Sequence, residues 1–148
     1  MLIRDRRGYS MTFWAVFIGL VLIPIFALSI ELGRYFYAIA EVQKAADAAA
    51  LAAATEFDPQ VFQESGDLVP NSRAWSTTQM YVSANTAGLS AKGVHAFVSD
   101  IQMDSGADTV FVRVSADLSV LFPSLVPKVM VKQVGVAKLR AFTDLSSQ

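Results

Sequence analysis

The fold is decided by an uncharged stretch near the amino end, residues 8–30, which reads GYSMTFWAVFIGLVLIPIFALSI. About 20 apolar residues, in a helix that rises about 1.5 Å per residue, cross a hydrocarbon core about 30 Å thick. A buried helix of a soluble protein is the alternative, but a chain of 148 residues is too short to surround it. The stretch therefore predicts a single membrane-spanning helix.

A cleaved signal peptide is a second alternative, because its apolar region also lies near the amino end. That region usually has about 7–15 residues, fewer than the stretch found here. The tripeptide AIA at residues 38–40 imitates a cleavage site, but charged Glu31 and Arg34 and three bulky aromatic residues precede it. We therefore expect the helix to remain attached as an anchor.

The charges that flank the span predict its orientation. Arg4, Arg6 and Arg7 precede the span, whereas Glu31 opens the other flank before Arg34. Short flanks rich in arginine stay in the cytoplasm. We expect residues 1–8 to form a cytoplasmic basic N-terminus and the bulk of the chain to lie periplasmic or extracellular.

The helix is expected to continue beyond the span through an alanine-rich segment, residues 31–54, which reads ELGRYFYAIAEVQKAADAAALAAA. Apolar and small residues recur there at a spacing of three and four, and Glu41 with Lys44 adds a charge pair one turn apart. Asp58-Pro59 is expected to end the helix, because the residue before proline is disfavoured in the α conformation. The prediction is one helix over residues 9–57, about 70 Å long.

Two features within the span concern its shape and its neighbours. Pro24 removes a backbone donor and crowds the carbonyl group of Leu20, which predicts a helix kink. Ala15 and Gly19 form a small-xxx-small step, which lets another helix approach closely.

Residues 58–148 are expected to form a small α+β head. A loop is predicted over residues 58–72, then a helix that Ser72 caps and that runs to about Thr86, where Gly88 closes it. Its predicted inner stripe consists of Trp75, Thr78, Val82 and Leu89.

From residue 94 the period of the sequence changes to two, which is typical of strands. Strands over residues 94–103 and 109–118 flank the turn DSGAD and predict a hairpin. A third strand is expected over residues 129–142, before a polar tail. Four residues of the second strand are expected to share one face: Val110, Val112, Val114 and Ala116. The fold class is thus α+β, a single-pass membrane protein with a long N-terminal helix and a head of one helix and a three-stranded antiparallel sheet.

The sequence offers no constellation for catalysis, a metal or a cofactor. Cysteine is absent, which excludes disulfides and thiolate sites, and the lone His95 has no nearby partner ligands. Asp100, Asp104 and Asp108 do not have the spacing of a calcium loop and are better explained by turn chemistry. Twelve basic against thirteen acidic residues give no basic field for nucleic acid. We expect a non-enzymatic protein without catalytic residues, cofactor or nucleic-acid partner.

The alanine-rich segment is the strongest candidate site. Spacing by three or four places five residues on one helical face, namely Phe36, Ala40, Gln43, Asp47 and Ala50. One interpretation is a solvent-facing edge of the helix. The other is a helix–helix contact face in a crowded bundle, where small methyl groups allow close approach and an amide and a carboxylate set the register. The partners would be other transmembrane subunits, membrane lipids or copies of the same chain.

The first third of the chain, from RRGYSM at residue 6 to ALAAA at residue 54, resembles the N-terminal region of TadE/TadG-like proteins of bacterial tight-adherence (Flp) pilus systems. That family typically has a basic pair with glycine, an apolar span, an acidic-x-Gly-Arg step and an LQ-x-AADAAALA segment. The corresponding stretches here are RRG at residues 6–8, the span, ELGR at 31–34 and VQKAADAAALA at 42–52.

Two departures from the family pattern limit what the resemblance implies. Pilin-like members that a prepilin peptidase cuts usually carry glutamate five residues after the cut glycine, where this chain has Phe13. Large members carry a von Willebrand-type domain with an Asp-x-Ser-x-Ser loop, which this sequence lacks. The resemblance implies a short structural or assembly component of the pilus, anchored in the bacterial inner membrane. The alternative is an accessory single-pass subunit of a respiratory or photosynthetic complex, packed against neighbouring transmembrane helices.

Overall fold

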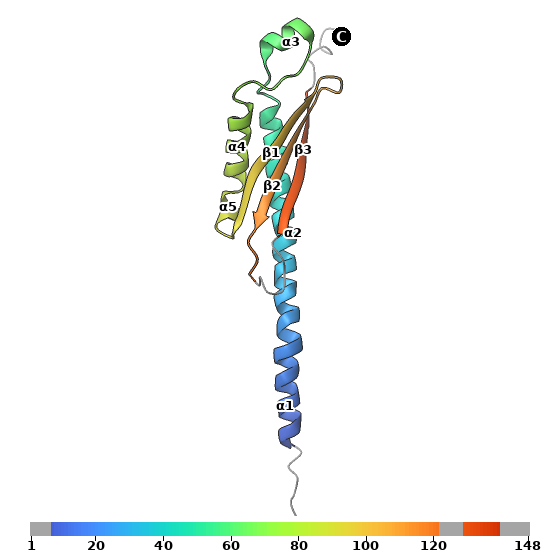
Figure 1. The fold of residues 1–148 in the computed structure, drawn as a ribbon, viewed down its shortest axis with the longest axis vertical. Helices are drawn as coiled ribbons and strands as arrows, with labels where there is room; N and C mark the ends of the chain where they lie inside the picture. The colour runs from blue at the N-terminus through green and yellow to red at the C-terminus, as the bar shows by residue number, and fades with distance from the viewer. Residues whose placement is uncertain (1–6, 122–128, 140–148) are drawn as a thin grey trace, which may run out of the picture.

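The computed structural model describes residues 7–121 and 129–139. One long helix carries a small head at the end opposite the N-terminus (Figure 1). The predicted fold class, α+β with a long N-terminal helix and a three-stranded antiparallel sheet, is confirmed.

The long helix consists of three consecutive segments: α1 (Arg7–Phe17), the π-helical turn η1 (Ile18–Leu22) and α2 (Ile23–Ala53). The amide of Ile23 donates to the carbonyl of Ile18, so this turn holds one residue more than an α-helical turn. Pro24 follows directly and breaks the regular ladder of hydrogen bonds. The helix therefore passes through the proline by widening the turn before it.

The helix ends at Ala53, four residues before the predicted end at Phe57. The amides of Thr55 and Glu56 donate to carbonyl groups three residues back, which tightens the last turn. Phe57 then forms an isolated β-bridge with Pro70.

The predicted loop over residues 58–72 is wrong in its first half, which contains α3 (Pro59–Ser65). The Asp58 carboxylate accepts hydrogen bonds from the amides of Gln60 and Val61 and so caps this helix. Aspartate at the N-cap and proline at the first helical position form a start signal. Asp58-Pro59 therefore begins a helix, and the long helix has already ended before it.

The second predicted helix is α4 (Ala74–Asn85), and the short helix α5 (Ala87–Ser90) continues it. Ser72 does not cap α4, because Arg73 occupies the N-cap position and its amide donates to the Asn71 side chain. Gly88 lies within α5, and the turn into the sheet uses Gly93 at a φ of 76°.

The predicted inner stripe of α4 and α5 is confirmed at Thr78, Val82 and Leu89, which are buried. It is wrong at Trp75, which is exposed. The buried position at the start of α4 is Ala74, four residues before Thr78, so the stripe follows a spacing of four.

The sheet consists of β1 (Val94–Asp104), β2 (Thr109–Leu118) and β3 (Val129–Lys138), antiparallel in the order β1-β2-β3. The predicted hairpin and the predicted start of the third strand are confirmed. β3 ends at Lys138, and the part of the predicted strand from residue 140, like the polar tail, lies outside the described residues.

The upper half of α2 packs against one face of the sheet and against α4 (Figure 1). The predicted inner face of β2 is confirmed, because its four members are fully buried: Val110, Val112, Val114 and Ala116. The residues of α2 in the same core are mostly alanine: Ala38, Val42, Ala46, Ala49, Ala50, Ala53. The head thus has its core helix inside residues 9–57, and a boundary at residue 58 does not separate two packing units.

Gly135 on β3 marks the closest approach of the sheet to α2. A Cβ atom at this position would overlap the carbonyl group of Ala46 and lie 2.7 Å from the amide nitrogen of Asp47. The backbones of helix and strand are therefore in direct contact. The close neighbour of the alanine-rich segment is therefore the chain's own sheet.

We expect Gly135→Ala to lower the free energy of unfolding of the head by about 1–3 kcal/mol or more, because the helix must move to admit a methyl group. Gly88→Ala is the matched control: a Cβ atom there meets nothing within 4 Å. The control should be neutral or slightly stabilising. Pulse proteolysis of the full chain in detergent, across a urea series, measures both variants. Equal urea midpoints for the two variants would contradict the close approach.

Candidate functional site

The lower half of the long helix exposes its apolar side chains. Within the described part of the chain, one helical stretch, Ser10–Ala53, is long and apolar enough to cross a membrane. Its most apolar window has a mean hydropathy of 2.6 and is 6% buried. A core helix of a soluble protein would be covered by the rest of the fold, so the length, composition and exposure of this helix support a membrane anchor.

Residues 10–30 of the anchor would cross about 30 Å at about 1.5 Å per residue. Ala15 and Gly19 lie in this part, and a Cβ atom built on Gly19 meets nothing within 4 Å. Nothing in the described chain occupies the space beside Gly19, so the predicted contact with another helix has room there. Arg7 begins α1, and the other two predicted topology residues, Arg4 and Arg6, lie outside the described residues.

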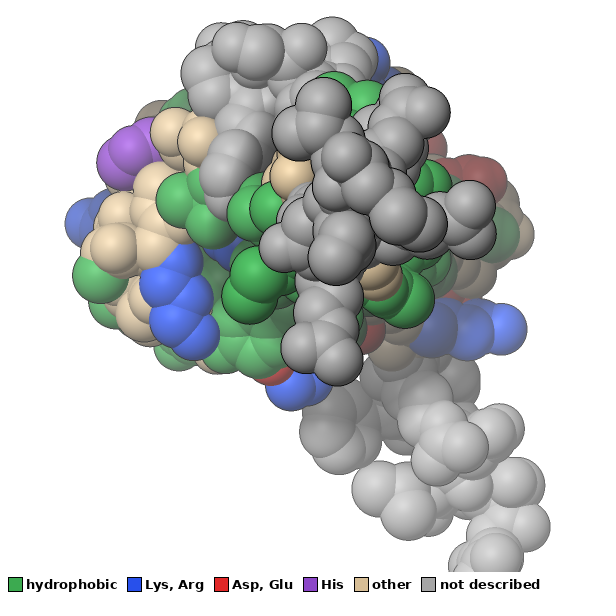
Figure 2. Space-filling view, turned by 90° about the horizontal axis from the view of Figure 1, so that it is seen from below, with side chains coloured by type: hydrophobic (Ala, Val, Ile, Leu, Met, Phe, Trp, Pro, Cys, Tyr) green, Lys and Arg blue, Asp and Glu red, His purple; other side chains and the backbone are tan. Residues whose placement is uncertain are grey.

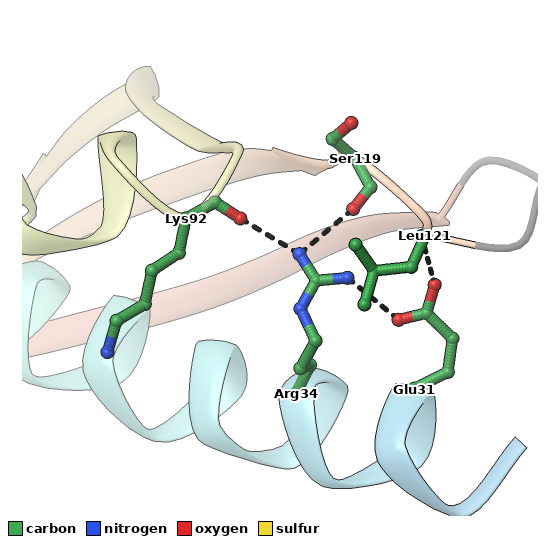
Figure 3. Close-up of polar contacts among 5 residues, drawn as sticks. All are labelled: Glu31, Arg34, Lys92, Ser119 and Leu121. Carbon is green, nitrogen blue, oxygen red and sulfur yellow. Dashed lines mark hydrogen bonds and ion pairs between the residues drawn. The ribbon is translucent and has the colours of Figure 1, made fainter. Parts of the chain in front are cut away.

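A head junction of five residues ties the lower edge of the head to α2 directly above the span: Glu31, Arg34, Lys92, Ser119 and Leu121 (Figure 3). The Arg34 guanidinium donates to the Glu31 carboxylate at 2.8 Å and to the carbonyl oxygens of Lys92 and Ser119 at 2.9 and 3.2 Å. The other carboxylate oxygen of Glu31 accepts a hydrogen bond from the backbone amide of Leu121.

The junction joins three segments that are distant in the sequence: α2, the turn before β1 and the end of β2 (Figure 3). Glu31 is only 5% exposed, so its charge is taken out of water and needs these partners. Glu31 and Arg34 lie three residues apart in the sequence, one helical turn, but their long-range partners are backbone groups, for which the sequence carries no signal.

The predicted contact face of α2 is divided in the structure. The Gln43 amide donates to the Asp47 carboxylate at 2.8 Å and to the carbonyl of Val134 on β3 at 3.1 Å. Ala50 is fully buried in the head, so it is unavailable to another helix. Both positions turn toward the head because α2 lies against β3. Phe36, Ala40 and Asp47 remain exposed, as an accessible contact face requires.

The exposed residues of α2 above the span form a surface that we call the α2 outer face. Phe36 is 60% exposed and Leu51 is 69% exposed, although both are large and apolar. Small residues lie between them, and apart from the adjoining helix itself nothing in the described chain lies within 4 Å of a Cβ built on Gly33. The face comprises Gly33, Phe36, Tyr37, Ala40, Lys44, Asp47 and Leu51.

Two lysine side chains on and beside this face interact with groups of the same chain. The Lys44 ammonium donates to the Glu41 carboxylate at 2.6 Å, and this hydrogen bond with its Coulomb attraction raises the pKa of Lys44. The Lys92 ammonium lies 4.4 Å from the centre of the Tyr37 ring. The apolar side chains are therefore the part of the face left for a partner.

The remaining candidates are His95 and the aspartates of the hairpin between β1 and β2. No group of three or more histidine, aspartate or glutamate side chains is placed to hold a metal ion there. The Asp104 carboxylate accepts hydrogen bonds from the backbone amides of Gly106 and Ala107, which confirms its interpretation as a turn residue. Asp100 pairs with Arg113 at 3.4 Å, and His95 is exposed on β1.

We expect Glu31→Gln to destabilise the head by about 1–3 kcal/mol. The glutamine side chain is neutral, so it no longer offers a negative charge and two accepting oxygens to the Arg34 guanidinium and the backbone N–H of Leu121. Hydrogen exchange at the Leu121 amide should speed up while the centre of β2 keeps its protection. Glu41→Gln is the matched control, since an exposed pair contributes about 0–1 kcal/mol. The same loss of protection in both variants would show that the junction does not hold the head.

The part of the chain that is similar to known proteins coincides closely with the long helix. Residues 8–56 match a family model described as putative Flp pilus-assembly TadE/G-like. No curated protein and no solved structure matches the chain. The match confirms the resemblance of the N-terminal third and supports a role related to Flp pilus assembly, carried by a region that comprises the anchor and the core helix of the head.

Proposed function

We propose that this protein is a structural component of a tight-adherence (Flp) pilus or a related envelope assembly, and that the α2 outer face packs against helices of neighbouring subunits. The observation that carries the proposal is the exposure of large apolar side chains, Phe36 and Leu51, above the span and inside the segment that matches the family model. Exposed apolar surface rimmed by polar residues is typical of an interaction site.

The mode of packing follows from the residue sizes on this face. Gly33 and Ala40 allow the backbone of another helix to come close, and Phe36 and Leu51 provide area to bury on either side. In the span, where lipid replaces water, Ala15 and Gly19 would extend the same kind of contact. The head would be carried as a rigid unit, because its core contains the same helix.

The orientation is also a proposal. The predicted cytoplasmic arginines precede the span, and the head lies beyond its other end (Figure 1). With the N-terminus in the cytoplasm, the head and the upper half of α2 would lie in the periplasm or at the cell surface.

We expect Ala40→Trp to reduce the amount of co-purifying neighbouring subunits at least tenfold while the head stays folded. The reason is that an indole at this position holds a partner helix away. Ala84→Trp, at an exposed alanine of α4, is the matched control and should leave association unchanged. Gentle detergent extraction with quantitative mass spectrometry measures the partners. The proposed contact would be ruled out by parental levels of association in the Ala40→Trp variant.

The absence of cysteine makes a direct test of orientation possible. A single cysteine at Gln63, which is exposed in α3, should react with a membrane-impermeant maleimide on intact spheroplasts. A single cysteine at Asp5 should react only after the membrane is permeabilised. The reverse labelling pattern would place the head in the cytoplasm.

A further inference from the structure

An apolar cavity of about 290 Å³ lies beneath the head, beside the head junction. Seen from below, hydrophobic side chains gather on this side of the molecule (Figure 2). Its walls come from two directions: Leu28, Leu32 and Tyr35 of α2, and Leu118, Val120 and Val129 at the lower end of the sheet. We propose that this cavity binds an acyl chain of a membrane phospholipid.

The position of the cavity relative to the span determines what can enter it. Leu28 belongs to the uncharged span and is 55% exposed, and Leu32 lies one turn further along and is 52% exposed. The wall formed by α2 therefore begins inside the hydrocarbon region and ends just above it. A cavity continuous with the lipid-facing surface of the span is bordered by acyl chains.

The chemistry of the lining favours an apolar ligand. Glu31 is the one charged residue among the described residues that line the cavity, and both its oxygens accept hydrogen bonds from within the chain. The Arg34 guanidinium beside it already donates to Glu31, Lys92 and Ser119. A phosphate headgroup would have to displace these bonds, whereas a hydrocarbon chain would bury apolar surface without breaking any. Binding should therefore depend on the acyl chain and be insensitive to headgroup charge.

A bound acyl chain would give the head a second attachment to the membrane. The cavity is shared by α2 and the lower end of the sheet, so its occupant contacts both at once. Filling the cavity would bury the apolar side chains that line it. The head would then be held at a defined height above the bilayer.

The test uses the full chain in nanodiscs that contain a phospholipid with a photoreactive diazirine on its acyl chain. We expect cross-links at Leu32, Val120 and Val129, equally from anionic and zwitterionic headgroups. Val129→Trp, which fills the cavity, should reduce the cross-links at Leu32 and Val120 at least fivefold and leave those on residues 10–27, which do not line the cavity, unchanged. Val134→Trp, on the same strand but away from the cavity, is the matched control and should cross-link like the parent.

A second variant gives an independent test if Val129→Trp misfolds. Leu32→Trp fills the cavity from the helix side, at a position exposed enough to tolerate the change, and should give the same loss at Val120. The proposal is overturned if the parent shows no cross-links above the span, or if both cavity variants cross-link like the parent. It is also overturned if a photoreactive residue at position 120 captures a neighbouring protein chain, because the cavity would then be a protein contact.

Discussion

The contact between the backbone of α2 and the backbone of β3 is the constraint on which the rest of the head depends. Gly135 admits the carbonyl of Ala46, and the alanines around it let a whole stretch of helix lie flat on the sheet. A buried methyl group removes little apolar area by itself. Dense packing of many small groups recovers the lost dispersion energy through short distances. The head can therefore be small and still have a continuous core.

The two halves of the long helix have different surroundings. Its lower half presents apolar side chains outward and is almost uncovered by the described chain, whereas its upper half buries alanine and valine against the sheet. The head junction lies between the exposed lower half and the packed upper half of the helix. It attaches the lower edge of the head to the helix by charge-assisted hydrogen bonds. Because no loop separates anchor from core, a tilt or rotation of the anchor must move the whole head with it.

Some elements could be predicted because their signals are local. Hydropathy indicates the uncharged span, and a period of two residues indicates the strand β2. Both elements lie where the sequence predicts them. Asp58-Pro59 failed as a stop signal because the same dipeptide is a start signal for a helix. Trp75 failed as a core residue because its size favoured burial while the helix phase is set by Ala74, Thr78 and Val82.

The candidate membrane-spanning helix, the hairpin with a third strand and the TadE/G-like first third could be inferred without a structure, because they depend on composition and spacing over short distances. Which side of the alanine-rich segment is buried, in contrast, depends on how the helix packs against the sheet. Every alanine presents the same methyl group, and the choice is made by a glycine 89 residues away, from position 46 to position 135. The partners of Glu31 and Arg34 are likewise backbone groups brought from afar, and backbone groups look the same at every position in a sequence.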